Sequence, residues 1–384
     1  MLTALTGRRS LLALALSLLV LGTTYQIKGN LDLIAGITAG DAVDLRSRDG
    51  EQAYFAQGVN PFDRMTASQP PWGYPFGEFL TWPPWPVVRV YFAALNAFAL
   101  ALLLWWAYRE PRDVETHVRL LLMASVFAFG GSCTATGVGQ VSIIVTVLLA
   151  GALWCDRIER PWWCGLLVGL ALVKPTISAP FAIALLLTRR FKAAAAAAAY
   201  GIAASGVTWL VTGANPVQML RQMMEAAALY AGDGTIGLNN VLIALGASPA
   251  GVALMPLVVA LPAMALITLT RSSLPMAFAI AAVWGRLWTY HKSYDDVMLV
   301  FLLIPLGVLA LGRAQSRAAA IAFFAIGVLA WIPGRILALP EIQILQLAVW
   351  PIALLVLLRL AAADRHWNWA IPRATTAARD QPAI

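Results

Sequence analysis

The chain has 384 residues, of which 60% are hydrophobic and only 12% are charged, and its mean hydropathy is +0.74. Because soluble domains carry about a quarter of their residues as charged side chains, this composition excludes a string of soluble domains and predicts one polytopic membrane domain. The net charge of +8 does not indicate nucleic-acid binding, since Lys and Arg collect in short loops and form no contiguous basic face. The three cysteines have no metal-site or disulfide spacing, and neither metal nor cofactor is expected.

The first apolar segment, 10–27, follows Arg8 and Arg9. Such a segment is a cleaved signal peptide or a retained signal-anchor. The sequence Leu-Gly-Thr-Thr-Tyr-Gln at 21–26 is a poor cleavage site, and many apolar segments follow. The segment is therefore predicted to stay as the first membrane span.

A long polar loop, 28–84, then interrupts the apolar sequence. Asp44, Arg48 and Glu51 have helical spacing, which predicts a short surface helix with one charged face. One interpretation is an interfacial helix with weak internal ion pairs. The other makes Asp41 or Asp44 a general base that takes a proton from a sugar hydroxyl.

Apolar runs after this loop give eleven further candidate spans, for an expected bundle of about 12 (10–12) transmembrane helices. They lie near 85–106, 118–135, 140–155, 161–173, 176–188, 194–212, 250–269, 273–289, 295–311, 318–332 and 342–361. The expected architecture is an all-α polytopic membrane protein with a single membrane domain over 1–364. A second outer segment is expected at 213–249, and a disordered cytoplasmic tail at 365–384.

The positions of Lys and Arg indicate the orientation of the spans. With a cytoplasmic N-terminus, most of the 27 basic residues fall in alternate, inner loops, as the positive-inside rule requires. Both termini are then cytoplasmic in a cell inner (plasma) membrane. The polar loop, Gln140, Lys174 and the stretch 290–295 all fall on the extracytoplasmic side. Such a gathering of polar groups at one side predicts a site there.

The pair Lys174-Pro175 separates two short apolar runs. A lysine among apolar residues faces a cavity or a partner, or else reaches the membrane surface from the tip of a hairpin. The first alternative makes Lys174 a contact for an anionic phosphate. Gln140 starts a span in the same part of the chain, where it either caps a helix or reaches a hydroxyl or phosphate.

A cluster of polar residues precedes the tenth span. Its candidate ligands for a phosphate or a sugar are Arg286, His291, Lys292, Tyr294 and Asp295. Helix capping explains the acids of this stretch, but it does not explain the His, Lys and Tyr side chains beside them. The chain carries no Walker loop, zincin helix, nucleophile elbow or dinucleotide fingerprint in a supporting context.

In this order, the motifs resemble glycosyltransferase family 87, the polyprenol-phosphate-mannose-dependent mannosyltransferases of the GT-C superfamily. The motifs are Asp-Leu-x-x-Arg-x-x-Glu at 44–51, Gly58-x-Asn60-Pro61-Phe62, Tyr74-Pro75, Trp82-Pro83-Pro84, Gly139-Gln140, Gly165 to Lys174-Pro175, and Tyr290-His291 to Asp296.

The resemblance implies a GT-C-like helical bundle with an outer cavity and an inverting mechanism. The implied donor is a mannose-like hexose on polyprenyl phosphate, and the acceptor is a lipid or a glycan. Asp44, or failing that Asp41, would be the base. Lys174 and His291 would offset charge on the departing phosphate, assisted by Arg286 or Lys292.

Two alternatives belong to other classes. A secondary transporter of a polar solute also suits twelve spans, although no internal repeat joins the two halves. A polymerase or ligase of surface glycans would share the outer cavity and the polyprenyl donor. An assay for transfer of a labelled sugar would distinguish the transporter from a glycosyltransferase. The identity of the acceptor would distinguish the polymerase or ligase from the glycosyltransferase.

Overall fold

This computed structural model describes residues 7–36, 42–230, 238, 242–243, 245–246, 249–288, 291–312, 315–333, 336 and 339–363. The predictions on Asp41, Tyr290 and the tail 365–384 lie outside these residues. Within them, the regular secondary structure is entirely helical. This result supports the expected all-α class, and the reason is physical: a helix satisfies its own backbone hydrogen bonds inside a bilayer.

The sixteen described α-helices follow one another through the chain. They are α2 (Arg8–Ala35), α3 (Val43–Ala56), α4 (Tyr74–Thr81), α5 (Val87–Arg109), α6 (Thr116–Phe127), α7 (Gly130–Val138), α8 (Ser142–Arg157), α9 (Pro161–Ala171), α10 (Pro175–Leu187), α11 (Phe191–Thr212), α12 (Pro216–Tyr230), α14 (Pro249–Leu269), α15 (Leu274–Leu287), α16 (Val300–Leu311), α17 (Arg317–Trp331) and α19 (Pro340–Ala363). Three short 3-10 helices are η1 (Pro61–Asp63), η2 (Pro71–Gly73) and η3 (Ser293–Leu299).

Five described helices are long and apolar enough to cross a membrane: α2, α5, α11, the continuous pair η3–α16, and α19. Helices α6 and α7 meet at an angle of 41° and form a sixth candidate span if they are counted together. Several remaining helices are apolar but shorter, among them α9, α10, α15 and α17. The chain is thus a polytopic membrane protein by length and composition of its helices, and the count of about twelve crossings stays a prediction.

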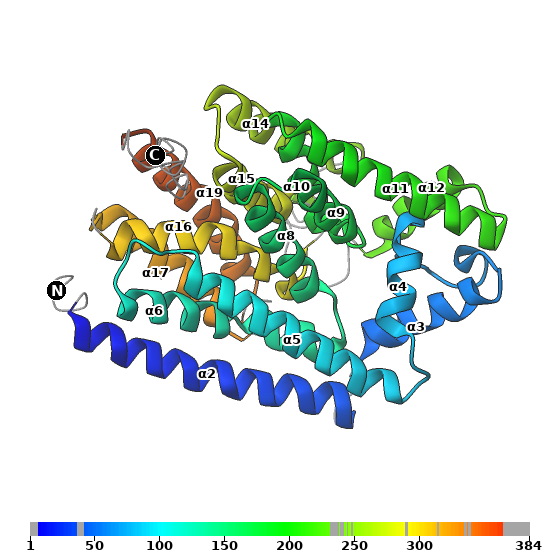
Figure 1. Cartoon of the computed structure of the whole chain (residues 1–384), viewed down its shortest axis with the longest axis horizontal. Coiled ribbons are helices and arrows are strands. Elements are labelled where there is room, and N and C mark those ends of the chain that lie inside the picture. The colour runs from blue at the N-terminus through cyan, green and yellow to red at the C-terminus, as the bar shows by residue number, and fades with distance from the viewer. Residues whose placement is uncertain are drawn as a thin grey trace, which may run out of the picture.

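Figure 1 shows how these helices are arranged. Helix α2 runs along one edge of the bundle and α11 along the opposite edge, with the other long helices between them. Helices α3 and α4 lie together beyond one end of the bundle, and α12 lies at that same end. The start of α2 and the end of α19 lie at the other end.

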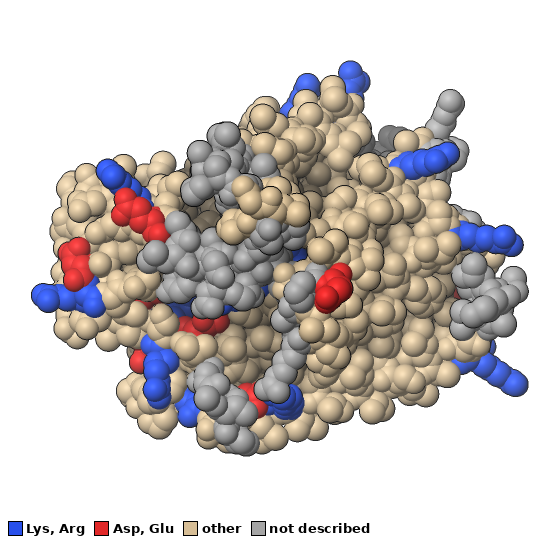
Figure 2. Space-filling model, turned by 180° about the vertical axis from the view of Figure 1, so that it is seen from behind, with Lys and Arg blue, Asp and Glu red and all other residues tan. Residues whose placement is uncertain are grey.

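Charge follows the same axis. On the face in Figure 2, acidic and basic side chains gather over the part that carries α3 and α4, whereas Lys and Arg protrude from the opposite end. A broad uncharged surface separates them. An uncharged belt between two charged ends is the surface that a membrane-embedded bundle requires.

The predicted break at Lys174 is present, and it divides what would be one span into two short helices. Helix α9 ends at Ala171, and Lys174 is the N-cap residue of α10. Pro175 occupies the first turn of α10, where the missing N–H costs nothing because that N–H has no intrahelical partner. The break therefore holds Lys174 at the ends of two helices, inside the bundle.

Beneath this break the core is closed by three aromatic rings from different helices. The ring centroid of Phe181 on α10 lies 4.9 Å from that of Phe278 on α15 and 5.4 Å from that of Phe301 on α16. The centroids of Phe278 and Phe301 are 5.7 Å apart. All three pairs are edge-to-face, which is a favourable arrangement for aromatic rings.

Candidate active site

The site begins where α3 approaches the turn between α7 and α8. The backbone N–H of Ala42 donates to the carbonyl of Gly137 at 2.9 Å, which fixes the start of α3 against the end of α7. Gly139 follows in the left-handed conformation, with φ of 76°. A Cβ atom at this position would lie 2.4 Å from the Cβ of Leu45, so only glycine fits here. The turn delivers Gln140 directly beside the first residues of α3.

Gln140 joins Asp44 to Lys174. Its amide nitrogen Nε2 donates to Oδ2 of Asp44 at 3.1 Å. Its oxygen Oε1 accepts from Nζ of Lys174 at 3.1 Å and from the N–H of Val141 at 3.1 Å. Because both donors require the oxygen on their side, the NH₂ group must face Asp44. The amide therefore holds the Asp44 carboxylate as a hydrogen-bond acceptor.

The ammonium group of Lys174 uses all three of its donors. Besides Gln140, it donates to Oγ of Ser142 at 3.0 Å and to Oδ1 of Asp295 at 2.5 Å. Its Nζ also lies 4.5 Å from the centroid of the Tyr294 ring. Burial of this ammonium group is acceptable because its charge is paired and its hydrogen bonds are complete. Lys174 thus joins α8 and η3 directly, and it is linked to α3 through Gln140.

The helix η3 carries two adjacent aspartates to different clusters. A 3-10 helix has about three residues per turn, so consecutive side chains point about 120° apart. Oδ1 of Asp295 accepts from Ser142 Oγ at 2.6 Å and from Lys174. Asp296 instead contacts Arg286 and His291, with each nitrogen 2.9 Å from its Oδ1.

This second cluster is closed to solvent. The side chains of Arg286 and His291 have no exposed surface, and that of Asp296 is 3% exposed. Nη2 of Arg286 also donates to Oε1 of Gln346 on α19 at 3.0 Å. The cluster therefore joins α15, η3 and α19 in the interior. The structure does not bring Arg286 and His291 into contact with Lys174.

Arg48 lies one helical turn after Asp44 on the buried face of α3. The residue is 7% exposed, and its Nε and Nη1 atoms make no hydrogen bond with any described residue. Burial lowers the pKa of its guanidinium group, whereas the charges of Glu51 and Asp44 act in the opposite direction. The Nε and Nη1 donors of this buried cation are therefore open to an anionic ligand.

The Glu51 carboxylate, a predicted substrate contact, bonds to the protein chain in this structure. Its carboxylate accepts from the N–H and Oγ of Ser68 at 2.9 and 3.0 Å, and from the N–H of Gln69 at 3.1 Å. These bonds fasten the loop after η1 to α3. Burial raises the pKa of Glu51, although these bonds and Arg48 act to lower it. In this structure Glu51 orders the loop beside the site.

The predicted residues that the structure describes thus fall into two clusters, apart from Glu51 and Lys292. Asp44, Gln140, Lys174, Tyr294 and Asp295 form one connected cluster, with Arg48 beside Asp44. Arg286 and His291 belong to the closed cluster behind η3, and Lys292 is half-buried at the N-cap of η3. Asp41 lies outside the described residues.

Three groups in these clusters are not among the residues predicted from the sequence. They are Ser142, which bonds both Lys174 and Asp295, the carboxylate of Asp296, and the amide of Gln346. The sequence did contain an indication for Asp296. A second acid beside Asp295 at the start of an apolar run needs a cation if it is buried, and this indicates an ion pair. There was no such indication for Gln346, because it lies in an apolar run far along the chain.

A polytopic helical bundle with a polar cluster at one end defines an integral membrane protein with a candidate site near the membrane surface, a form that an integral membrane transferase shares with other classes. The family model described as glycosyltransferase family 87 matches residues 69–289, which is more than half of the chain. The chain belongs to glycosyltransferase family 87 and is a GT-C-type membrane glycosyltransferase. No curated protein and no solved structure matches the chain. The predicted family is confirmed, and the transporter alternative is set aside.

Proposed function

We propose that this glycosyltransferase takes a mannose-like hexose from a polyprenyl-phosphate donor at the extracytoplasmic face of the inner membrane. The acceptor is a lipid or glycan hydroxyl, and the configuration at the anomeric carbon inverts. The single observation that carries the proposal is Arg48, a buried guanidinium group with donors that no described residue uses. A monoanionic or dianionic phosphate supplies the acceptor atoms that this group requires.

Asp44 is proposed as the general base. In the reaction the acceptor oxygen attacks the anomeric carbon, and the bond from that carbon to the phosphate oxygen breaks. The phosphate leaves with the electron pair, and Asp44 receives the proton of the acceptor hydroxyl. Gln140 supports this role because its amide orients the carboxylate through a hydrogen bond of 3.1 Å to Oδ2.

Lys174 is proposed to act through its neighbours. Its three donors are already bonded to Gln140, Ser142 and Asp295, so it orients these groups and adds positive charge near the phosphate. Arg48 is the better candidate for direct contact with the phosphate. Lys292 stays a candidate for a contact from the η3 side.

The proposed orientation has support from the arrangement of the helices. The start of α2 and the end of α19 lie at the same end of the bundle, opposite α3 and α4 (Figure 1). Lys and Arg protrude from that end (Figure 2), as expected for a cytoplasmic surface. The candidate site then faces the extracytoplasmic side, where a flipped lipid-linked sugar is available.

The test is sugar transfer from labelled polyprenyl-phosphate hexoses into a lipid extract, with membranes that contain wild type, Asp44→Asn, Asp41→Asn or Asp49→Asn. Asp49 lies on α3 outside the cluster and is the matched control. We expect transfer with the wild type and the control, and a loss of at least about a thousandfold with Asp44→Asn. Full transfer by folded Asp44→Asn would overturn the assignment of the base, and loss only in Asp41→Asn would move it to Asp41.

The phosphate role of Arg48 has its own test. Arg48→Gln removes the charge and leaves a shorter, neutral side chain that still carries a hydrogen-bond donor, and it should weaken donor binding by about tenfold or more. Binding of the donor is measured by titration of purified protein in detergent. Unchanged donor affinity in a folded variant would contradict the role.

A further inference from the structure

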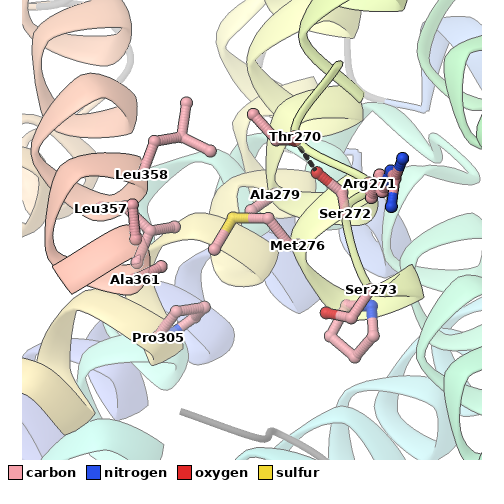
Figure 3. Close-up of a pocket in the computed structure, with 12 residues that line it drawn as sticks. Thr270, Arg271, Ser272, Ser273, Met276, Ala279, Pro305, Leu357, Leu358 and Ala361 are labelled. Carbon is pink, nitrogen blue, oxygen red and sulfur yellow. Dashed lines mark hydrogen bonds between the residues drawn. The ribbon is translucent and has the colours of Figure 1, made fainter. Parts of the chain in front are cut away.

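A groove opens at the end of the bundle opposite the candidate site. It lies between the start of α15 and the helices α16 and α19, and it encloses a cavity of about 310 Å³. Figure 3 shows Leu357 and Leu358 of α19 on one side of this groove and the loop from Thr270 to Ser273 on the other. No residue of the proposed transfer reaction lines it.

The loop side of the groove is polar. Arg271 is exposed, and its side chain makes no ion pair with a described residue. Its backbone is in the left-handed region, with φ of 48°. Ser272 Oγ lies 2.5 Å from the hydroxyl of Thr270. The first turn of α15 has no side-chain cap, so the backbone N–H groups of Leu274 and Met276 have no side-chain acceptor, whereas Pro275 has no N–H.

The helix side of the groove is apolar. Met276 of α15, Pro305 of α16, and Leu357 and Leu358 of α19 form its wall. A free inorganic anion would leave this wall uncovered. A molecule with an anionic head and a hydrocarbon chain satisfies both sides of the groove, because its head pairs with Arg271 while its chain covers the wall.

We propose that this groove binds an anionic phospholipid of the cytoplasmic leaflet. The lipid phosphate lies against Arg271 and the uncapped first turn of α15, and an acyl chain lies against α16 and α19. This inference depends on the proposed orientation of the bundle, which places the groove at the cytoplasmic surface. Basic pockets between membrane helices at that surface bind anionic head groups.

The experiment is native mass spectrometry of the whole purified protein after addition of phosphatidylglycerol or phosphatidylcholine with the same acyl chains. We expect the wild type to retain phosphatidylglycerol preferentially. Arg271→Gln should lower the retained phosphatidylglycerol by about fivefold, which corresponds to the usual contribution of one cation near a membrane surface. Arg317→Gln is the matched control, because Arg317 is exposed on α17 and does not line the groove.

A second variant and a competitor separate the remaining outcomes. Ala361→Phe fills the apolar part of the groove and should lower the retention of phosphatidylglycerol without a change of charge. Equal retention of both lipids by the wild type, or no effect of Arg271→Gln, would overturn the proposal. Displacement of the lipid by millimolar inorganic phosphate would also overturn it, because the groove would then be a phosphate site. Sugar transfer is measured in a separate assay. Failure of the lipid-binding proposal can therefore be distinguished from failure of the proposed transferase function.

Discussion

Two charged clusters lie on either side of η3, and they differ in how they are completed. Around Lys174, the bonds run from α10 to α8, α3 and η3, and they end at Asp44 beside the free donors of Arg48. Around Asp296, Arg286 and His291 are fully buried and bond the same carboxylate oxygen. The first cluster leads to groups that can accept a substrate, whereas the second is enclosed by protein.

The difference shows that two adjacent aspartates on one short helix can serve unlike purposes. Asp295 is part of a network that continues to the candidate base. Asp296 binds η3 to α15, and through Arg286 to α19. We infer that the enclosed cluster positions η3, so that the position of Asp295 depends on it. Three variants of the two clusters and one variant of α4 test this difference.

The largest effect is expected from Arg286→Met. This change leaves the Asp296 carboxylate buried without its cation, which should reduce the free energy of unfolding by about 3–5 kcal/mol. The double variant Arg286→Met/Asp296→Leu removes both charges and should recover most of that stability. Thermal unfolding in detergent measures both. Normal stability of the single variant would show that the enclosed cluster does not hold η3.

Lys174→Met is expected to affect transfer more than folding. Loss of the ammonium group releases Gln140 and Asp295, and the resulting misplacement of Asp44 should lower the transfer rate by about a hundredfold. The variant Lys174→Met/Asp295→Leu should regain stability but not transfer. Recovery of transfer in that double variant would mean that the network has no part in catalysis.

A smaller effect is expected from Gln140→Leu. The Asp44 carboxylate loses one donor, and transfer should fall by about tenfold. If Gln140 acts only through Asp44, its replacement in an Asp44→Asn background should have no further effect on the residual rate. Additive losses in this cycle would give Gln140 a role of its own.

The smallest effect concerns Glu78 on α4. Burial, and the charge of Asp49, raise the pKa of its carboxyl in the folded protein. Such a group stabilises the fold below its unfolded pKa of about 4.3, and this contribution is lost as the pH rises through the folded pKa. Because the group is only half-buried and solvent screens its charge, Glu78→Gln should stabilise the protein at pH 7.5 by only about 0.3 kcal/mol. The difference from wild type should disappear near pH 4, and an equal difference at both pH values would contradict the explanation.

Much of this arrangement follows from local sequence rules. The helical spacing of Asp44, Arg48 and Glu51 predicted a charged helix face, and Pro175 predicted a helix start after Lys174. Periodicity could not show which of these charges would be paired. The bonds from Lys174 to Ser142 and Asp295 join residues 32 and 121 positions away, and no local pattern encodes such distances. For the same reason, local patterns could not show that Arg286 and His291 lie apart from the candidate site. Their partner is Asp296, whose side chain points away from that of Asp295.

The short helix α9 has a consequence for the membrane itself. At about 1.5 Å per residue, its 11 residues extend only about 16 Å, roughly half of the hydrocarbon thickness. If water reaches the level of Lys174, as the proposed function requires, the transmembrane voltage falls across the remaining half. The rings of Phe181, Phe278 and Phe301 pack against one another on α10, α15 and α16. We expect them to help exclude water from that layer and so to keep the enzyme from conducting protons and other ions.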